Sequence, residues 1–238
     1  MLFRSNTPTY ENSEEYWQYR SIEKMQADFR GIAPSADVGL EVKGFADAQH
    51  IVGYTLMIGD GAGNKPETNR DKRAYLALPL HWKDFRLEPY VDYENVRVLS
   101  ATSANVFDAR DRATYKVFAG YDIPHGAVGY EYVEQVGHRP VGVYSYAVGH
   151  SLFARWTASP VLAVFARGDL WASDLNIANR VNQLLYVGGV DWQPFKDVHI
   201  MPNVESLQYT AKGTAVVPAH HDLQARVTLY WKFTKPQS

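Results

Sequence analysis

The segment from Asp60 to Lys65 is the part of the sequence most similar to a phosphate- or calcium-binding loop. It reads Asp-Gly-Ala-Gly-Asn-Lys and is followed by Pro66. A phosphate-binding loop ends in Gly-Lys-Ser/Thr, and a calcium loop needs an oxygen ligand at the position that Ala62 occupies here. The segment therefore indicates an ordinary loop and gives no sign of a nucleotide or metal cofactor.

The side chains that serve as nucleophiles or metal ligands are scattered along the chain. There are 8 His and 0 Cys, and no Gly-x-Ser-x-Gly motif occurs. His220 and His221 are adjacent, so their side chains diverge on a strand or turn and cannot easily share a metal ion. The sequence therefore predicts no metal site, no cofactor and no enzyme activity.

Composition excludes two further classes. Lys and Arg total 24 against 26 Asp and Glu, a formal net charge of −2, whereas a general nucleic-acid partner requires a basic excess. Hydrophobic residues make up 46% of the 238 residues, too many for a disordered chain. Aromatic residues are abundant, at 16 Tyr, 10 Phe and 6 Trp.

Charged residues concentrate on one parity of segments that alternate with a period of two. The opposite parity is apolar and ends in aromatic rings, as at Trp82, Phe85, Trp192 and Trp231. A packed core cannot hold so many charges, whereas a water-filled lumen can. The predicted pore-lining residues are Arg86, Glu88, Asp92, Lys116, Arg167, Asp169, Asp191, Glu205, Arg226 and Lys232.

Turn residues between the alternating segments divide the chain into about eleven strands. The predicted spans are 36–46, 50–59, 71–82, 85–96, 111–123, 126–137, 141–154, 160–171, 182–194, 198–210 and 222–233. Most are about 10–13 residues long, near the roughly 9–11 of tilted membrane strands. Short connections alternate with long polar ones, except at 138–140, and this asymmetry is typical of outer-membrane barrels.

These patterns predict an all-β fold, an antiparallel transmembrane β-barrel built as a meander. Residues 36–233 form its strands and residues 234–238 a C-terminal tail. Residues 1–35 form a long loop in which only 12–29 could hold a short helix. Two arrangements of this loop stay open: it folds into the lumen and narrows it, with charges at Glu14, Glu15, Arg20, Glu23 and Lys24, or it is a solvated outer loop.

Several motifs resemble the C-terminal part of bacterial outer-membrane porins, in the broad group that contains the phosphate-selective porins. They are 19–24 (Tyr-Arg-Ser-Ile-Glu-Lys), 35–39 (Ser-Ala-Asp-Val-Gly), 54–57 (Tyr-Thr-Leu-Met), 59–68, 201–205 (Met-Pro-Asn-Val-Glu) and 226–233. The resemblance implies a bacterial outer-membrane location, contact with outer-membrane lipid, passive diffusion of small hydrophilic solutes or ions, and a homotrimer of larger barrels. Because porins carry further strands before this region, we expect the chain to be a fragment of a larger barrel.

Two alternatives stay open on the sequence alone. In a soluble antiparallel sheet the apolar parity is the core and the charged parity faces water. That arrangement suits a β-rich small-molecule carrier of the lipocalin type. A barrel-embedded enzyme is the less favoured alternative, because no motif calls for one.

Overall fold

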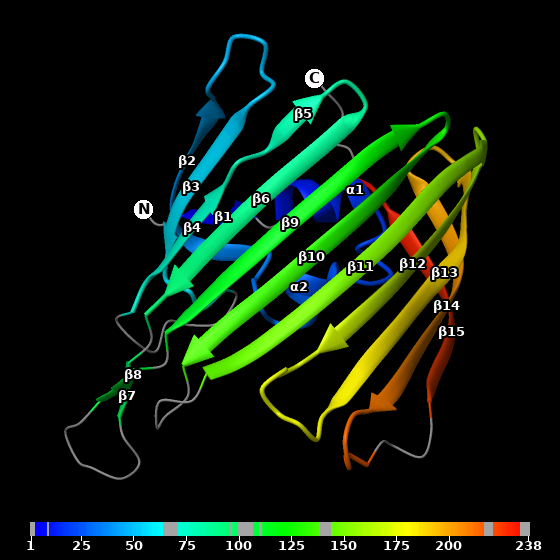
Figure 1. Cartoon of the computed structure of the whole chain (residues 1–238). Helices are drawn as coiled ribbons and strands as arrows, with labels where there is room; N and C mark the ends of the chain where they lie inside the picture. Colours follow the sequence, from blue (N-terminus) through cyan, green and yellow to red (C-terminus); the bar gives the residue numbers. More distant parts are fainter. Residues whose placement is uncertain are drawn as a thin grey trace.

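The structure is a computed structural model that describes residues 3–8, 10–63, 71–95, 97–99, 107–109, 111–138, 144–216 and 221–233. One curved antiparallel sheet of thirteen strands wraps around the N-terminal segment (Figure 1). Neighbours in the sheet follow the order of the chain, with only the β7–β8 hairpin set apart from it. The all-β antiparallel meander predicted from the sequence is confirmed.

The strands β1 to β8 are Phe3–Asn6, Ala36–Phe45, Gly53–Gly59, Arg73–Ala77, Leu80–Trp82, Phe85–Glu94, Arg97–Leu99 and Phe107–Ala109. The strands β9 to β15 are Arg112–Ile123, Gly126–His138, Tyr144–Ser159, Leu162–Ala172, Val181–Phe195, Val198–Ala211 and Asp222–Trp231. Each of the eleven predicted spans corresponds to a strand or a pair of strands.

Three features differ from the prediction. Residues 3–6 form strand β1 within the stretch expected to be loop, and they pair with β2 from Phe3↔Gly39 to Asn6↔Ala36. The long connection after β6 contains the small β7–β8 hairpin. The predicted strand 71–82 is divided into β4 and β5 around Pro79, which has no N–H to donate to a strand ladder.

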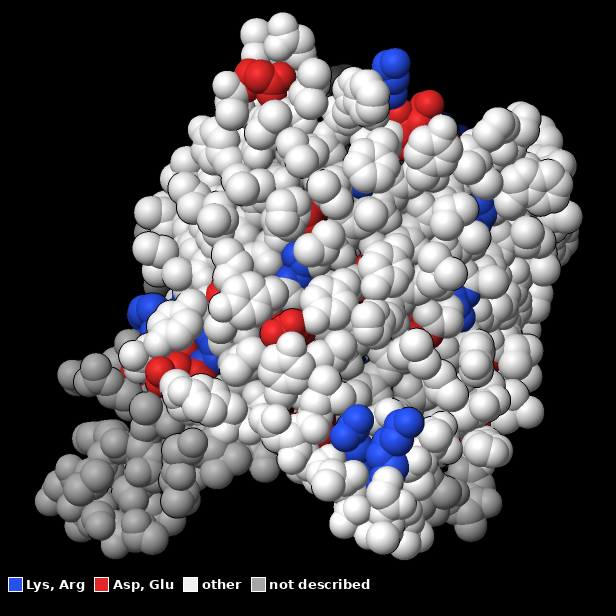
Figure 2. Space-filling view, in the orientation of Figure 1, with Lys and Arg blue, Asp and Glu red and all other residues white. Residues whose placement is uncertain are grey.

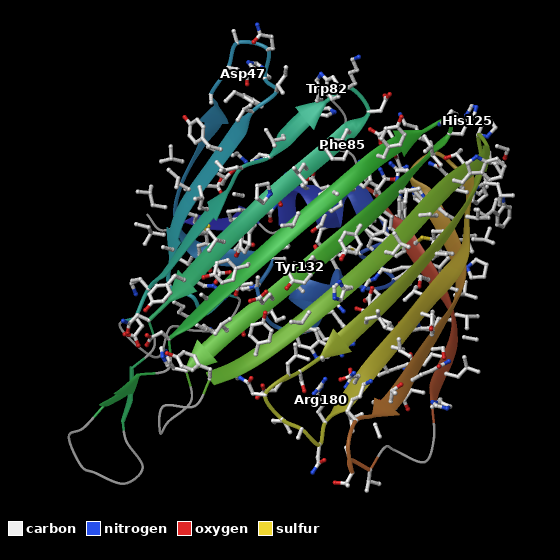
Figure 3. All side chains as sticks on the ribbon, viewed as in Figure 1. Asp47, Trp82, Phe85, His125, Tyr132 and Arg180 are labelled. Atoms are coloured by element: carbon white, nitrogen blue, oxygen red, sulfur yellow. The ribbon has the colours of Figure 1, made fainter. Side chains whose placement is uncertain are left out.

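The connections differ strongly between the two ends of the sheet. At one end, two-residue turns join β5 to β6, β9 to β10, β11 to β12 and β13 to β14. Lys83, His125 and Asp197 adopt positive φ there, the backbone form that tight hairpins require. Figure 3 labels Asp47, Trp82, Phe85 and His125 at this short-turn end and Arg180 at the opposite, long-loop end. The predicted loop asymmetry is therefore present, although 64–70, 139–143 and 217–220 lie outside the described residues.

The two faces of the sheet separate by residue parity as predicted. On β15, Val227, Leu229 and Trp231 are exposed at 66%, 73% and 60%, whereas Arg226 and Thr228 are half-buried and bonded to β14. The convex surface in Figure 2 is largely free of charged side chains over the strands. An apolar outer surface ringed by aromatic side chains is what a bilayer-spanning barrel presents to lipid.

Residues 7–35 fold against the concave face of the sheet (Figure 1). They contain a π-helical turn, Tyr10–Glu14, and two short helices, α1 (Glu15–Trp17) and α2 (Gln26–Phe29). We call this stretch the inner segment. Both of its ends meet at the β1–β2 hairpin, where the N–H of Thr7 donates to the carbonyl oxygen of Ser35 at 3.0 Å. The inner segment is therefore an excursion inserted between two paired strands.

The sheet does not close on itself in the described part of the chain. Strands β1 and β15 stand at the two ends of the strand order and each has one neighbour. No described helix is long and apolar enough to cross a membrane. Residues 234–238, the predicted C-terminal tail, lie outside the described residues.

Candidate functional site

Aromatic residues of the inner segment attach it to the sheet. The ring of Tyr16 lies 5.4 Å from that of Phe118 on β9, and the ring of Trp17 lies 5.3 Å from that of Phe153 on β11. Tyr19 stacks on Phe165 of β12 at 4.1 Å. All six of these rings are at most 5% exposed, so the interior of the curved sheet is filled by packed side chains here.

A lysine on the inner wall connects two carboxylates with the inner segment. The Nζ of Lys116 lies 3.4 Å from Glu88 Oε1 and 3.7 Å from Glu131 Oε2, and it donates to Ser13 Oγ at 3.1 Å. Asn12 donates from its side chain to the second oxygen of Glu88. Lys116, Glu88 and Glu131 come from β9, β6 and β10 and are at most 2% exposed. We call Lys116, Glu88, Glu131 and Ser13 the lysine hub.

Two more buried cations support the inner segment from the wall. Arg73 donates to both oxygens of Asp92, at 2.9 and 2.7 Å, and to the carbonyl oxygen of Ile32 at 2.8 Å. Arg167 binds Asp169 at 2.7 Å and lies 5.4 Å from the ring centre of Trp17. Each arginine thus neutralises a wall carboxylate and contacts the inner segment.

The ten predicted pore-lining residues fall into two groups. Glu88, Asp92, Lys116, Arg167, Asp169 and Glu205 are buried, whereas Arg86, Asp191 and Arg226 are half-buried and Lys232 is exposed. Arg86 lies 3.6 Å from Asp122, Asp191 lies 2.9 Å from His199 Nδ1, and Arg226 binds Glu205. The interior at the buried residues is ionic but dry, because the inner segment covers the charges that the sequence placed in water.

The predicted constriction residues lie within the inner segment, and three of them belong to one ion-pair chain. Glu14 is 3% exposed and accepts from Arg20 at 2.7 Å and from the N–H of Met25 at 2.8 Å. Arg20 also binds Asp28 at 2.7 Å, and Lys24 lies 3.5 Å from the same carboxylate. Glu23 is half-buried, and Glu15 is exposed. The charges of the inner segment therefore brace it internally as well as against the wall.

Burial shifts the titration of the acidic residues in the inner segment. Desolvation raises the pKa of Glu14 to about 7, opposed by Arg20 and the Met25 N–H and reinforced by the nearby charges of Asp28 and Glu131. Desolvation also raises the pKa of Glu23. Glu14 therefore exchanges its proton near neutral pH, unlike an exposed glutamate.

A cavity of about 530 Å³ remains beside the inner segment at the short-turn end of the sheet. Asn12 and Glu15 line one side of it, and wall residues including Lys43, His81 and Arg86 line the other. The Nε of Arg86 is buried and has no hydrogen-bond partner among the described residues. The cavity thus carries both signs of charge, with two carboxylates, two cations and two histidines in its lining.

The sequence analysis missed several residues that position the inner segment. The inward-facing positions of β4 and β6 also include Arg73, Tyr75 and Glu94. They were not among the predicted pore-lining residues. Asp37 accepts from the Tyr75 hydroxyl at 2.6 Å and from the N–H of Gly61 at 3.0 Å. Applying the same alternation of charged and apolar positions to residues 71–77 would have identified Arg73 as an inward-facing charge. Among the described residues, no group of three or more His, Asp or Glu could hold a metal ion.

No protein-family model matches the chain, and no curated protein matches it. Two solved structures share the fold. OmpT, expressed in the outer membrane of Vibrio cholerae, superimposes with a TM-score of 0.68 at 11% identity, over 97% of this chain and 76% of that one. A mutant of the same protein that lacks loop L8 gives a TM-score of 0.65 at 11% identity, over 97% and 74%.

The likeness to OmpT also corrects one sequence-based conclusion, namely that the chain is not an enzyme. That conclusion took the alternating pattern as the mark of a passive channel and the missing serine motif as evidence against catalysis. The shared barrel at 11% identity fixes the fold alone, and one fold can carry different chemistries. The exclusion of enzyme activity is therefore wrong. The fold and its apolar outer face identify a membrane β-barrel protein of the bacterial outer membrane.

Proposed function

We propose that the chain forms a channel through which small hydrophilic solutes or ions diffuse passively across the outer membrane, as in the porin group that its motifs resemble. The observation that carries the proposal is the inner segment, a charged stretch held inside an inside-out barrel by ion pairs and aromatic contacts. A segment in this position packs against part of the wall and narrows the path, because open space remains beside it.

Selectivity in this proposal belongs to the side chains around the cavity. Lys43, Arg86 and Glu15 all line it. Two unit charges about 4 Å apart interact by roughly 4 kcal/mol at an effective dielectric of 20, against about 1 kcal/mol in bulk water. Charges in a narrow opening therefore bias ion passage more than charges on exposed turns.

The β1–β2 hairpin offers a clean test of the constriction. Residues 8–34 can be replaced by Asn-Gly, because the strands on either side are already paired at Asn6↔Ala36. In planar bilayers the wild-type protein should conduct, and the shortened protein should conduct several-fold more. Arg86→Glu should move the reversal potential toward cations, whereas Lys196→Glu, on an exposed turn outside the cavity, should not. A folded wild-type protein that gives no conductance would overturn the proposal.

A further inference from the structure

A groove of about 430 Å³ opens on the outer face of β11–β14, near the long-loop end. Its lining is mainly apolar and includes Val148, Leu170, Ala172, Leu175 and Leu184. Leu170 and Leu175 are 53% and 37% exposed. The groove therefore lies on the surface that meets the bilayer, on the opposite side of the sheet from the inner segment.

Residue parity and strand register arrange this groove in rows. On β13 the buried Leu185 and Val187 mark the odd positions as inward, so the even positions point outward. One outward row runs Leu184–Leu170–His150, and the next runs Asn182–Ala172–Val148. Thr210 pairs with Asn182 and completes the second row. The rows make a continuous strip across four strands.

Two cations stand at the long-loop end of the strip. The N–H of Lys212 donates to the carbonyl oxygen of Arg180 at 2.8 Å, which places the two residues side by side just beyond β14 and β13. The guanidinium of Arg180 donates only to neutral oxygens, those of Asn182, Leu175 and Ile177. Within the described part of the chain neither cation forms an ion pair. Figure 3 shows Arg180 at this end of the barrel.

An apolar strip that leads to two unneutralised cations matches the shape and charge of one membrane lipid. From the row of Arg180 to the row of Leu184 is four residues, about 13 Å along a strand, which accommodates much of an acyl chain. The cations lie at the level where lipid headgroups meet water. We propose that this groove binds a phosphate-bearing anionic lipid, with its acyl chain along the leucine rows and its phosphate between Arg180 and Lys212.

The cations can be tested directly by native mass spectrometry of the full-length protein in detergent with added phosphatidylglycerol or phosphatidylcholine. Wild-type protein should retain one phosphatidylglycerol and show a clear preference for it over phosphatidylcholine. A juxtamembrane cation contributes about 1 kcal/mol toward an anionic lipid, which is about fivefold in affinity. The double variant Arg180→Gln/Lys212→Gln should therefore bind about thirtyfold more weakly.

A matched control removes two cations from the opposite rim. Lys83→Gln/Lys196→Gln changes the net charge equally at exposed two-residue turns and should leave phosphatidylglycerol binding unchanged. If both double variants retain phosphatidylglycerol equally, the proposal is overturned, because binding would then depend on net charge or be nonspecific. All variants are compared after their barrel content is checked by circular dichroism.

The acyl chain has a separate test. Ala172→Trp fills the strip without touching the cations, so it should weaken phosphatidylglycerol binding while the binding of inorganic phosphate, if any, stays the same. A site for free phosphate would be insensitive to this change, and that result contradicts the proposal. The variant Thr210→Cys tests whether a second copy of the chain, instead of a lipid, occupies the groove. Rapid oxidative cross-linking of this variant in lipid vesicles would show that protein covers the groove and would also overturn it.

Discussion

The inner wall has two regions that carry the same kinds of residues in different surroundings. Under the inner segment, Lys116 on β9 is 1% exposed and contacts Glu88, Glu131 and Ser13. On β15, the side chain of Arg226 is 36% exposed and binds Glu205. Both cations lie on the inward parity of long antiparallel strands. The inner segment covers the first region, whereas Arg226 lies on β15, which stands at the end of the strand order and has one neighbour in the described sheet.

This comparison separates two properties of a charged residue on a strand, namely the face of the sheet that it occupies and the amount of water around it. Alternation decides which side of the sheet a charge occupies. The amount of water around that charge depends on a distant part of the chain, and so does its energy, because a buried charge without a partner costs several kcal/mol. Charges in the covered region are buried in ion pairs, whereas Arg226 in the open region is partly exposed.

The largest expected effect comes from the lysine hub. Lys116→Ala leaves Glu88 and Glu131 buried with no countercharge, and it should lower the free energy of unfolding by about 3–5 kcal/mol. Urea unfolding in detergent micelles, followed by tryptophan fluorescence, measures this loss. Lys116→Met with Glu131→Gln should recover part of it, because the charge imbalance is smaller. A loss below about 1 kcal/mol for Lys116→Ala would mean that water reaches the hub.

A smaller effect is expected from the titration of Glu14. Its pKa is about 7 in the folded protein and near 4.5 when exposed, so the folded state holds the proton more tightly. Stability from this residue is therefore full below about pH 4.5, falls as the pH rises toward 7, and is level above that. The total change is roughly 3 kcal/mol at most.

Limited proteolysis of the inner segment across this pH range measures the effect of Glu14. Cleavage should become faster between pH 5 and 7 in the wild-type protein. Glu14→Gln should remove the dependence, whereas Glu15→Gln, at the exposed neighbouring position, should keep it. An unchanged pH profile in Glu14→Gln would assign the proton to a different carboxylate.

The smallest expected effect belongs to the open region. Arg226→Ala removes a partly exposed ion pair to Glu205 and should change the free energy of unfolding by about 1 kcal/mol or less. Lys232→Ala, at an exposed position past the end of β15, should change it even less. If Arg226→Ala costs as much as Lys116→Ala, the two regions are equally dry and the distinction drawn between them fails.

The strands could be predicted because a period of two persists over ten or more residues in most of them. Strand β1 is only Phe3–Asn6, too short for alternation to be visible, and it pairs with β2 across the whole inner segment. The β7–β8 hairpin has three residues in each strand and was not predicted for the same reason. Short strands depend on partners that lie elsewhere in the chain.

The sequence predicted which face of the sheet the charged residues occupy, but it did not predict which residues contact one another. The sequence placed Glu88, Lys116 and Arg167 on the inward side and Glu14 and Arg20 on a segment that enters the barrel. It gave no means of pairing Lys116 with Ser13 or Trp17 with Phe153, because such contacts depend on how an irregular segment packs. Tyr16, Trp17 and Tyr19 were visible as an aromatic cluster, yet nothing local identified their partners on β9, β11 and β12.

The position of the inner segment has a consequence for the order in which the chain folds. At one end of the sheet two-residue turns join neighbouring strands, but β1 and β2 are separated by residues 7–35. Closing a loop of that length instead of a two-residue turn costs roughly 2 kcal/mol more in chain entropy, since each doubling of loop length adds about 0.6 kcal/mol. Hairpins with short turns form first, because their contacts are local. Strand β1 therefore joins the sheet late, after the wall that receives Trp17 has been assembled.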